Sequence, residues 1–429
     1  MTEKTLLLGQ LFLTNGDPLQ SPWQDVCHIE TAGALLLEDG RIAHVGPADA
    51  IRRAHPQVRV IDYADKLITP GFVDAHAHYP QTAMIASWGK QLIDWLNDYT
   101  FPEEIRLADP DYATEIAARY LDLVLDHGTT TVCSYCTVHP HSVDAFFDAA
   151  AARGMAVLAG KTCMDRNAPP ALCDTAQSAY DDSAALLARW HNTGRAKYVI
   201  TPRFSPTSTP EQLAALGALW AAHPDCLMQT HLSEQKPEIE WVRTLYPTAR
   251  DYLDTYEAHG LLGARALFGH AIYLEPREID RLSEIGAAVV HCPTSNTFIG
   301  SGLMDVFGLA ARGIKVGLAT DTGGGSSFSM LRTMAAAYEI AQLRGQALHP
   351  AQLLWLATAG SARSLHLEHE LGRLAAGQAA DLCVLDLAST PAIAQRVAVA
   401  DDPWEAVFPT IMMGDDRAIK DVWIAGRQR

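Results

Sequence analysis

The sequence has few basic residues for its acidic content. Its 429 residues include 33 lysines and arginines against 50 aspartates and glutamates, a formal charge of −17. A chain of this charge repels phosphate backbones and anionic lipid surfaces. Hydrophobic residues make up 48% and charged residues 19%, which is typical of globular proteins and unlike disordered or membrane-spanning chains. We therefore expect no nucleic-acid partner and no membrane association.

Cysteine is also sparse. The eight cysteines are spread over the whole chain, mostly inside apolar runs, whereas a secreted disulfide framework concentrates them in a short chain. An apolar stretch near the amino terminus is interrupted by Gln10, and no small-residue cleavage site follows it. We expect reduced thiols, a strand in place of an export signal, and a cytoplasmic protein.

Several familiar motifs are missing or incomplete. No Gly-x-Gly-x-x-Gly follows the first strand of the α/β region, and the three glycines at 323–325 lack the lysine of a phosphate loop. Cys133 and Cys136 form a C-x-x-C without a second pair, and Val132 stands where the cytidine-deaminase signature requires proline. These absences argue against a dinucleotide site, a phosphate loop and that type of zinc site.

The pattern of the chain changes at residue 67. Before it, short strand-like runs and an Asp39-Gly40 turn signal indicate a small β unit. After it, apolar runs alternate with long Ala/Leu-rich helical patterns, as in βαβ units. Eight runs qualify as strands: 67–75, 129–134, 156–161, 198–202, 227–230, 266–269, 287–290 and 315–319. Eight repeats favour an α/β fold of the closed (β/α)8 TIM type over a doubly wound sheet.

Short strand patterns return near the end of the chain, at 381–386 and 421–424. We predict that both chain ends build one small β-sandwich domain, residues 1–66 plus 380–429. The barrel would then comprise residues 67–379.

Metal-binding residue types recur where the predicted barrel strands end. His76 and His78 end the first strand, where a period of two residues points both imidazoles the same way. His231 follows strand five, and Asp321 ends strand eight. Because the carboxyl ends of barrel strands meet on one face, these residues are expected to share a site. Three imidazoles and a carboxylate suit zinc, or another divalent transition metal, with one position left for water.

Three further residues lie at comparable positions. Glu234 comes shortly after strand five, where it fits either an exposed acid in the first turn of a helix or a proton shuttle beside an activated water; we favour the shuttle. His270 follows strand six and is expected nearby. His291 ends strand seven, but Cys292-Pro293 turns the chain away. We keep His291 out of the ligand set and expect it to orient Asp321 or to pack below the site.

These positions carry a resemblance to the amidohydrolase superfamily, in Pro70-Gly71-Phe72-Val73-Asp74 followed by His76-Ala77-His78. Over nearly the whole chain, further motifs are similar to those of its guanine deaminase family: His78-Tyr79-Pro80-Gln81, Gln91-Leu92-Ile93-Asp94-Trp95-Leu96, Tyr99-Thr100-Phe101-Pro102, Met164-Asp165-Arg166-Asn167-Ala168-Pro169, Thr201-Pro202-Arg203-Phe204-Ser205, His231-Leu232-Ser233-Glu234, His291-Cys292-Pro293-Thr294-Ser295-Asn296 and Gly414-Asp415-Asp416-Arg417.

The resemblance implies hydrolysis of guanine to xanthine and ammonia by a cytosolic homodimer. It implies one zinc ion per chain, held by His76, His78, His231 and Asp321. Catalytic roles fall on Glu234 as the proton shuttle, Asp321 and His270. The substrate contacts it implies are Gln81, Arg203, Phe204, His78, His231, Glu234 and Asp321.

Arg203 also suits guanine on physical grounds. A guanidinium only donates hydrogen bonds, so it matches the 6-oxo acceptor of guanine and mismatches the 6-amino group of adenine. A wrong base leaves buried polar groups of the site unpaired, and it can be rejected for that reason by a factor of ~10⁴ or more. Anchoring the 6-oxo edge would present C2 and its amino group to the metal.

Three alternatives are weighed against this function. A two-metal hydrolase of cyclic amides would need a carbamylated lysine, for which Lys161 at the end of strand three is the candidate, although the usual fourth-strand position holds Arg203. A catalytically silent scaffold would have lost ligands that are all present here. A pterin or 8-oxoguanine shows the same 2-amino-4-oxo edge to Gln81 and Arg203, and the sequence does not separate these substrates from guanine.

Overall fold

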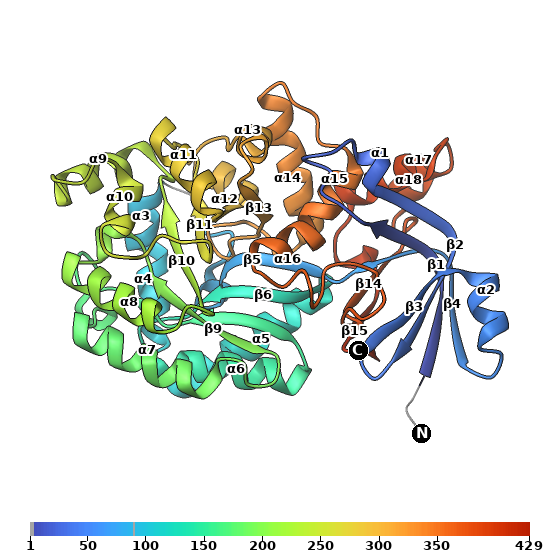
Figure 1. Cartoon of the computed structure of the whole chain (residues 1–429), viewed down its shortest axis with the longest axis horizontal. Coiled ribbons are helices and arrows are strands. Elements are labelled where there is room, and N and C mark those ends of the chain that lie inside the picture. Colours follow the sequence, from blue (N-terminus) through green and yellow to red (C-terminus); the bar gives the residue numbers. More distant parts are fainter. Residues whose placement is uncertain (1–3, 89–90) are drawn as a thin grey trace. The chain divides into compact units, whose positions relative to one another are not determined.

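The computed structural model describes residues 4–88 and 91–429, and its named strands fall into two sheets (Figure 1). The first is a mixed sheet in the order β16-β15-β14-β4-β1-β2-β3. Its strands are β1 (Lys4–Thr14), β2 (Cys27–Glu38), β3 (Arg41–Pro47), β4 (Arg59–Pro70), β14 (Leu382–Leu385), β15 (Ile419–Ile424) and β16 (Arg427–Gln428).

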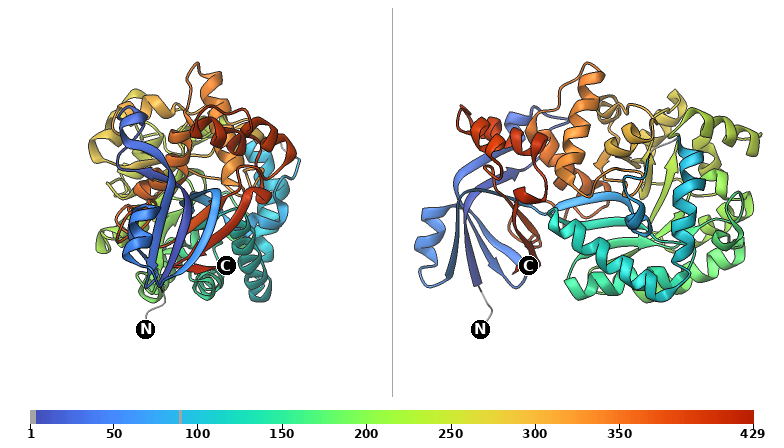
Figure 2. Two further views of the ribbon diagram at one scale, coloured as in Figure 1. Left: turned by 90° about the vertical axis from the view of Figure 1, so that its right-hand side faces the viewer. Right: turned by 180° about the vertical axis from the view of Figure 1, so that it is seen from behind.

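Both chain ends contribute to this sheet, as predicted. Figure 2 shows the C-terminal strands, in red, beside the blue N-terminal ones. β1 pairs antiparallel with β2 and parallel with β4, and β4 pairs antiparallel with β14. Leu6 and Leu8 of β1 face one hydrophobic core, while Leu7 and Leu11 face another. The predicted β-sandwich is therefore a single hydrogen-bonded sheet with a core on each face.

The second sheet is the predicted barrel, with the path β13-β12-β11-β10-β9-β7-β6-β5 and β8 added to β9. Its strands are β5 (Phe72–His78), β6 (Thr129–Tyr135), β7 (Ala156–Gly160), β8 (Thr162–Cys163), β9 (Ala196–Pro202), β10 (Leu227–Leu232), β11 (Ala266–His270), β12 (Ala288–His291) and β13 (Lys315–Leu318). Pairs from β7 to β13 run parallel. The backbone N–H of Asp321 donates to the carbonyl of His76 at 2.9 Å, which links the two ends of the path.

The first barrel strand lies further along the chain than predicted. Residues 67–70 end β4 of the terminal sheet, where they pair with β14, and the barrel strand begins at Phe72. A side chain at Gly71 would place its Cβ 2.1 Å from Oγ1 of Thr130, so only glycine fits between the two strands. The apolar run looks continuous in sequence because residues on both sides of Gly71 are buried.

The longer helices of the barrel lie along the outside of its strands, as Figure 1 shows for α6, α7 and α8. Several begin with proline, which fits the first helical position because its missing N–H has no partner there anyway. The helices are α1 (Trp23–Val26), α2 (Ala48–Ala54), α3 (Leu92–Trp95), α4 (Phe101–Arg106), α5 (Pro110–Asp126), α6 (Pro140–Arg153), α7 (Ala176–Trp190), α8 (Pro210–Ala222), α9 (Lys236–Leu245), α10 (Tyr252–Glu257), α11 (Pro276–Ile285), α12 (Pro293–Phe298), α13 (Val306–Ala311), α14 (Met330–Leu343), α15 (Pro350–Trp355), α16 (Ser361–Ser364), α17 (Pro391–Val397) and α18 (Pro403–Met413). Shorter 3-10 and π turns are η1 (Tyr79–Met84), η2 (Leu96–Thr100), η3 (Pro170–Leu172), η4 (Ser205–Thr207), η5 (Leu356–Gly360) and η6 (Asp416–Ala418).

The chain divides into two compact units, and the candidate site residues all belong to the second. The first unit is Met1–Asp74, Leu123–Thr131 and Ser329–Arg429; the second is Ala75–Asp122 and Val132–Phe328. The domain limits drawn from the sequence follow the change of pattern at residues 67 and 380, and they stay a prediction. Within the described part of the chain, no helix combines the length and apolar character needed to cross a membrane.

Candidate active site

Strand ends far apart in the sequence bring three histidines and one aspartate together. His76 and His78 lie on β5 and His231 on β10, and one ring nitrogen of each lies within 4.8 Å of the others. Oδ1 of Asp321, shortly after β13, is 3.4 Å from Nε2 of His76 and 3.5 Å from Nε2 of His78. All four side chains are buried. The residues predicted as metal ligands therefore form one cluster of N and O donors.

The electrostatics of this cluster suit a divalent cation. Burial lowers the pKa of His76, and burial with nearby positive charge lowers the pKa values of His78 and His231 well below the usual value. Burial alone would raise the pKa of Asp321, but its hydrogen bond with His76 and the charges of the histidines lower it to about 2. Neutral imidazoles and an ionised carboxylate are the protonation states in which these groups bind metal.

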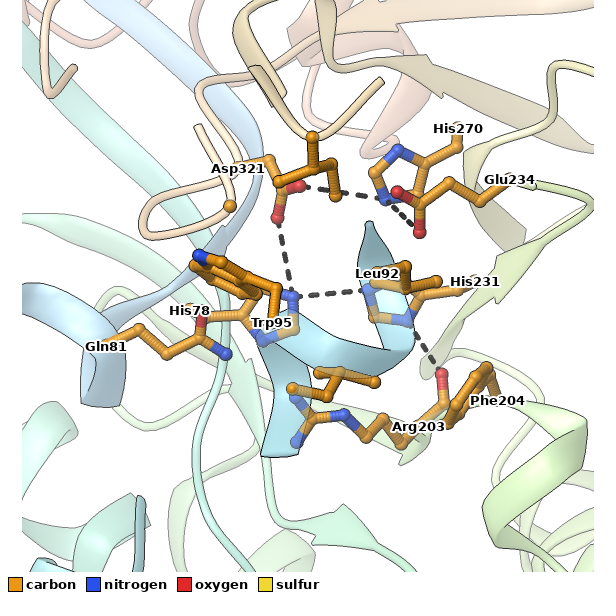
Figure 3. A pocket seen from close by; sticks show the side chains of 13 residues that line it. His78, Gln81, Leu92, Trp95, Arg203, Phe204, His231, Glu234, His270 and Asp321 are labelled. Carbon is orange, nitrogen blue, oxygen red and sulfur yellow. Dashed lines mark hydrogen bonds and ion pairs between the residues drawn. The ribbon is translucent and has the colours of Figure 1, made fainter. Parts of the chain in front are cut away.

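The orientation of His231 is fixed by the backbone. Its Nδ1 lies 2.7 Å from the carbonyl oxygen of Arg203, which can only accept, so Nδ1 carries the hydrogen. Its Nε2 lies 3.2 Å from Nε2 of His78, as Figure 3 shows. Next to them, a Cβ on Gly269 would come within 2.7 Å of Cε1 of His76. The lack of a side chain at Gly269 leaves room for the His76 ring.

Backbone strain is concentrated at the same strand ends. Ser233, His270 and Asp321 have φ angles of 49°, 66° and 50°, in the left-handed region that residues other than glycine rarely adopt. Such conformations cost on the order of 1–3 kcal/mol each and persist only where surrounding structure enforces them. Their clustering at the candidate site is consistent with a functional constraint on these residues.

Glu234 and His270 form a second polar pair beside the cluster. Oε2 of Glu234 lies 3.5 Å from Nε2 of His270, whose Nδ1 donates to Oδ1 of Asn296 at 2.9 Å. The hydroxyl of Ser301 donates to Oε1 of Glu234 at 2.7 Å. Glu234 precedes α9 and is buried, so it is not the exposed first-turn acid of the alternative interpretation. Ser301 was not singled out from the sequence, and Asn296 appeared there only as the end of a motif, without a role.

The pKa values of both members of this pair are raised. Burial raises the pKa of Glu234 and outweighs the charge of His270, which lowers it, while the charge of Asp321 raises it further. Burial alone would lower the pKa of His270, but the negative charges of Glu234 and Asp321 outweigh it and raise it. A carboxyl group with a raised pKa is suited to taking up and returning a proton near neutral pH.

A buried carboxylate behind Glu234 holds its backbone. Oε2 of Glu238 accepts the N–H groups of Glu234 at 3.0 Å and Gln235 at 2.9 Å, while its Oε1 accepts the hydroxyl of Tyr252 at 2.7 Å. Burial, with the charge of Glu234, raises the pKa of Glu238 to about 7. Nothing in the local sequence marks Glu238, which is an ordinary acid in the first turn of α9.

His78, His231, Glu234, His270 and Asp321 all line one cavity. In Figure 3, Glu234, His270 and Asp321 lie on one side of the His78 and His231 rings. Gln81 and Arg203 lie on the other side. The lining residues are His78, Gln81, Leu92, Trp95, Leu96, Arg203, Phe204, His231, Glu234, His270, Ile299, Asp321 and Gly324. The predicted substrate contacts therefore share one cavity with the cluster.

Gln81 and Arg203 meet at a residue that the sequence analysis missed. Nε2 of Gln81 donates to Oε1 of Glu104 at 2.8 Å, and Nη1 of Arg203 donates to Oε2 of Glu104 at 2.7 Å. Oε1 of Gln81 accepts the N–H of Gly323 at 3.3 Å. Phe204 follows Arg203 and completes this side of the cavity.

His291 and Lys161, like the predicted ligand His76, are not among the residues that line the cavity. His291 is buried, its pKa is lowered to about 3 by burial and the charge of His270, and within the described residues neither ring nitrogen has a hydrogen-bond partner. It therefore packs in the barrel without a hydrogen bond to Asp321. The ammonium of Lys161 forms a buried ion pair with Asp174.

Cys292 was not weighed as a ligand in the sequence analysis, yet its thiol joins a second group of donors. The thiol, His76, His270 and Asp321 each offer one atom within 4.8 Å of the others. This group shares His76 and Asp321 with the cluster above, so both describe the same region of the barrel.

Known proteins match this chain over most of its length. The model of the amidohydrolase family matches residues 67–429. Guanine deaminase of Escherichia coli is 44% identical over 92% of this chain and 90% of its own. The solved structure of E. coli guanine deaminase superposes with a TM-score of 0.96 at 41% identity, covering 99% of both chains. Guanine deaminase from C. acetobutylicum, solved with guanine in its active site, has a TM-score of 0.90 at 28% identity, covering 99% of this chain and 100% of its own.

The chain belongs to the amidohydrolase family. The resemblance drawn from its motifs is confirmed, and so is the predicted TIM-type barrel with its additional sheet from the chain ends.

Proposed function

We propose that this protein hydrolyses guanine to xanthine and ammonia. The observation that carries the proposal is the single cavity in which a cluster of metal-binding donors, a buried carboxyl group and two hydrogen-bond donors face one another. Close relatives along nearly the whole chain are named guanine deaminases, and one was solved with guanine bound. The geometry of the cavity and the similarity to these relatives support the proposal separately, because the geometry is that of this chain alone.

Four residues would hold one zinc ion per chain: His76, His78, His231 and Asp321. They fit the ion because neutral, buried imidazoles and a carboxylate are donors that zinc prefers in proteins. When bound, zinc lowers the pKa of a water molecule so that hydroxide is available near neutral pH.

The base would be read on the opposite side of the cavity. Arg203 donates a hydrogen bond to the 6-oxo group, Gln81 donates beside it, and Phe204 provides an apolar wall. In this orientation C2 and its amino group point toward His78, His231 and the carboxylates. Adenine would face a donor with its own 6-amino group and is excluded by unpaired buried groups.

Glu234 would move the protons. Its carboxylate takes a proton from the attacking water and gives it to the ring nitrogen next to C2. It then takes the second proton from the hydroxyl group now on C2 and gives it to the amine, which leaves as ammonia as the C2–N bond breaks and the carbonyl of xanthine forms. Ser301 holds one oxygen of this carboxylate, and His270 lies beside the other. Asp321 holds the water in place, and His270 stabilises the charge that develops on the adduct.

The test is ammonia release by the zinc-loaded protein from a panel of guanine, 8-oxoguanine, isoxanthopterin and adenine. Guanine is expected to have the highest kcat/KM and adenine no measurable turnover. A higher kcat/KM for isoxanthopterin or 8-oxoguanine would transfer the function to that 2-amino-4-oxo heterocycle. Two metal ions per chain would support the cyclic-amide hydrolase, which the Lys161–Asp174 ion pair disfavours because a paired ammonium is not available for carbamylation.

The remaining expectations complete this proposal. Residues 67–379 form the catalytic domain, and residues 1–66 with 380–429 form an accessory β domain. The protein acts in the cytoplasm as a homodimer and uses no nucleic-acid or membrane partner. Light scattering on the purified protein checks the dimer. One chain has a mass of 46.6 kDa, and the dimer should have twice that mass.

A further inference from the structure

One buried carboxylate joins the two residues expected to read the base. Glu104 lies on α4, outside the ring of strand ends that carries the metal-binding cluster. It accepts Nε2 of Gln81 on one oxygen and Nη1 of Arg203 on the other, at 2.8 and 2.7 Å. All three side chains are almost completely buried, with relative exposures of 1–3%. Its two partners lie 23 and 99 residues away in the chain.

The same short helix holds Arg203 from a second direction. Phe101, one turn before Glu104 on α4, places its ring 5.6 Å from the guanidinium carbon of Arg203. Leu92, Trp95 and Leu96, just upstream of α4, line the cavity. The segment that covers the cavity therefore also fixes the arginine inside it.

These bonds limit what Gln81 and Arg203 can offer a ligand. An ionised carboxylate only accepts, so both partners must turn an N–H toward it. The carbonyl oxygen of Gln81 is used by the N–H of Gly323. Gln81 can therefore offer its second N–H to the cavity. The guanidinium of Arg203 has further N–H groups and no acceptor. Both residues are thereby held as donors.

We propose that Glu104 is a positioning residue that fixes Gln81 and Arg203 as a pair of donors and so sets the specificity for a purine with two adjacent acceptors on one edge. The 6-oxo group and N7 of guanine form such an edge. This inference rests on the proposed function and adds the residue that enforces its selectivity.

The ion pair between Glu104 and Arg203 also sets the charge of the cavity. Glu104 neutralises Arg203 within the protein, so the reading side of the cavity carries no unpaired charge. An unpaired buried arginine would attract anions and destabilise the fold, whereas a paired one leaves a neutral surface with directed donors. The cavity is thereby suited to a neutral free base more than to a phosphorylated one.

The main test is Glu104→Gln. A carboxamide accepts on one atom and donates on the other, so one neighbour must face a donor; Arg203 cannot adapt, and Gln81 must flip its amide away from Gly323. We expect KM for guanine to rise roughly 10- to 100-fold, the effect of losing one charge-assisted hydrogen bond, with kcat changed only a few-fold. The melting temperature reports separately on folding.

Hypoxanthine and 2,6-diaminopurine separate positioning from chemistry. Hypoxanthine has the 6-oxo group and N7 but no 2-amino group, so its inhibition constant measures binding alone. This constant should rise together with KM in Glu104→Gln. The preference for guanine over 2,6-diaminopurine, which carries a donor at C6, should fall by a similar factor. A residue that only stabilised the fold would lower the melting temperature and leave the preference unchanged.

The matched control is Glu103→Gln on the same turn of α4. Glu103 is also buried, but its carboxylate pairs with Arg106 and Tyr112, neither of which lines the cavity, so KM, the hypoxanthine constant and the preference should stay at wild-type values. If Glu104→Gln does not fold, Glu104→Asp tests the positioning role of Glu104 in its place. It keeps the charge but is too short to reach both partners, and the inhibition constant should rise about threefold or more.

The outcomes separate the two proposals. Wild-type protein that releases no ammonia from guanine rejects the proposed function and this inference with it. Active wild-type protein, with unchanged hypoxanthine binding and purine preference in a folded Glu104 variant, overturns the role of Glu104 alone.

Discussion

The two sides of the cavity are built in different ways. On one side, His76, His78, His231 and Asp321 stand at the carboxyl ends of barrel strands, where the backbone itself sets their positions. On the other, Gln81 and Arg203 follow strands but are held by Glu104, which reaches them from a helix outside the barrel. In the proposed function, strand ends therefore supply the chemistry, and a residue of α4 positions the groups that bind the base.

This difference predicts different consequences of mutation. Changes among the strand-end residues should remove turnover, because they supply groups that act on the reacting atoms. Changes on the reading side should alter KM and selectivity while chemistry continues, because those interactions are made equally in the ground and transition states.

The largest effect is expected from removing the metal. Dialysis against a chelator should reduce ammonia release to background, since neither Glu234 nor His270 replaces the activated water. One equivalent of zinc per chain should restore it. Metal analysis with activity titration checks the stoichiometry; full activity in metal-free protein would show that the histidine cluster has no catalytic role.

Glu234→Gln should come next, with kcat reduced about 10²- to 10⁴-fold, the contribution usual for a general acid–base group. Guanine affinity and zinc content should remain, because Glu234 is not a metal ligand in the proposal and its contact with the base serves proton transfer. Steady-state kinetics with metal analysis measures both. Glu240→Gln, an exposed acid on α9 paired with Arg243, is the control, and a near-normal kcat in the Glu234 variant would remove that residue from the mechanism.

Arg203→Lys tests the reading side. Lysine keeps the charge but loses the planar fork, so it cannot serve Glu104 and the base together. KM for guanine should rise roughly 10-fold or more while kcat changes little. Arg106→Lys, at an exposed arginine on α4, should leave both unchanged. A selective loss of kcat in the Arg203 variant would break the division between the two sides.

The last prediction concerns stability and not turnover, through the support behind Glu234. The pKa of Glu238 rises from 4.5 to about 7 on folding, so between these values the unfolded chain loses a proton that the folded chain keeps. The contribution of Glu238 to stability is thus fully present below pH 4.5 and is lost as the pH rises to about 7. Relative to Glu238→Gln, the wild-type free energy of unfolding should fall by up to about 3 kcal/mol over that range. Urea unfolding of both proteins at several pH values measures this difference, and parallel pH profiles would contradict it.

The side built from strand ends could be predicted from the sequence, and the other side only in part. His76, His78, His231 and Asp321 are marked by the period of the strands and by their place after apolar runs. Arg203 also follows a strand, but its role came from resemblance. Strand patterns and family motifs each identify residues that stand out in their local sequence.

Glu104, Glu238 and Ser301 could not be found in this way. Each is an ordinary polar residue in its local sequence, and its importance comes from partners that only the tertiary structure brings close. The limit of the first barrel strand was missed for a related reason. Burial on both sides of Gly71 hides the change from one sheet to the other, and periodicity carries no information about which strands pair.

Arg203 contributes to both sides of the cavity through different atoms. Its side chain lines the cavity, while its carbonyl oxygen accepts the hydrogen on Nδ1 of His231. Every amino acid has that carbonyl, so replacing the side chain at position 203 leaves the histidine held as before. An amidohydrolase built this way can acquire a new substrate by exchanging this reader without having to rebuild its metal centre, which makes position 203 a natural starting point for redesigning selectivity.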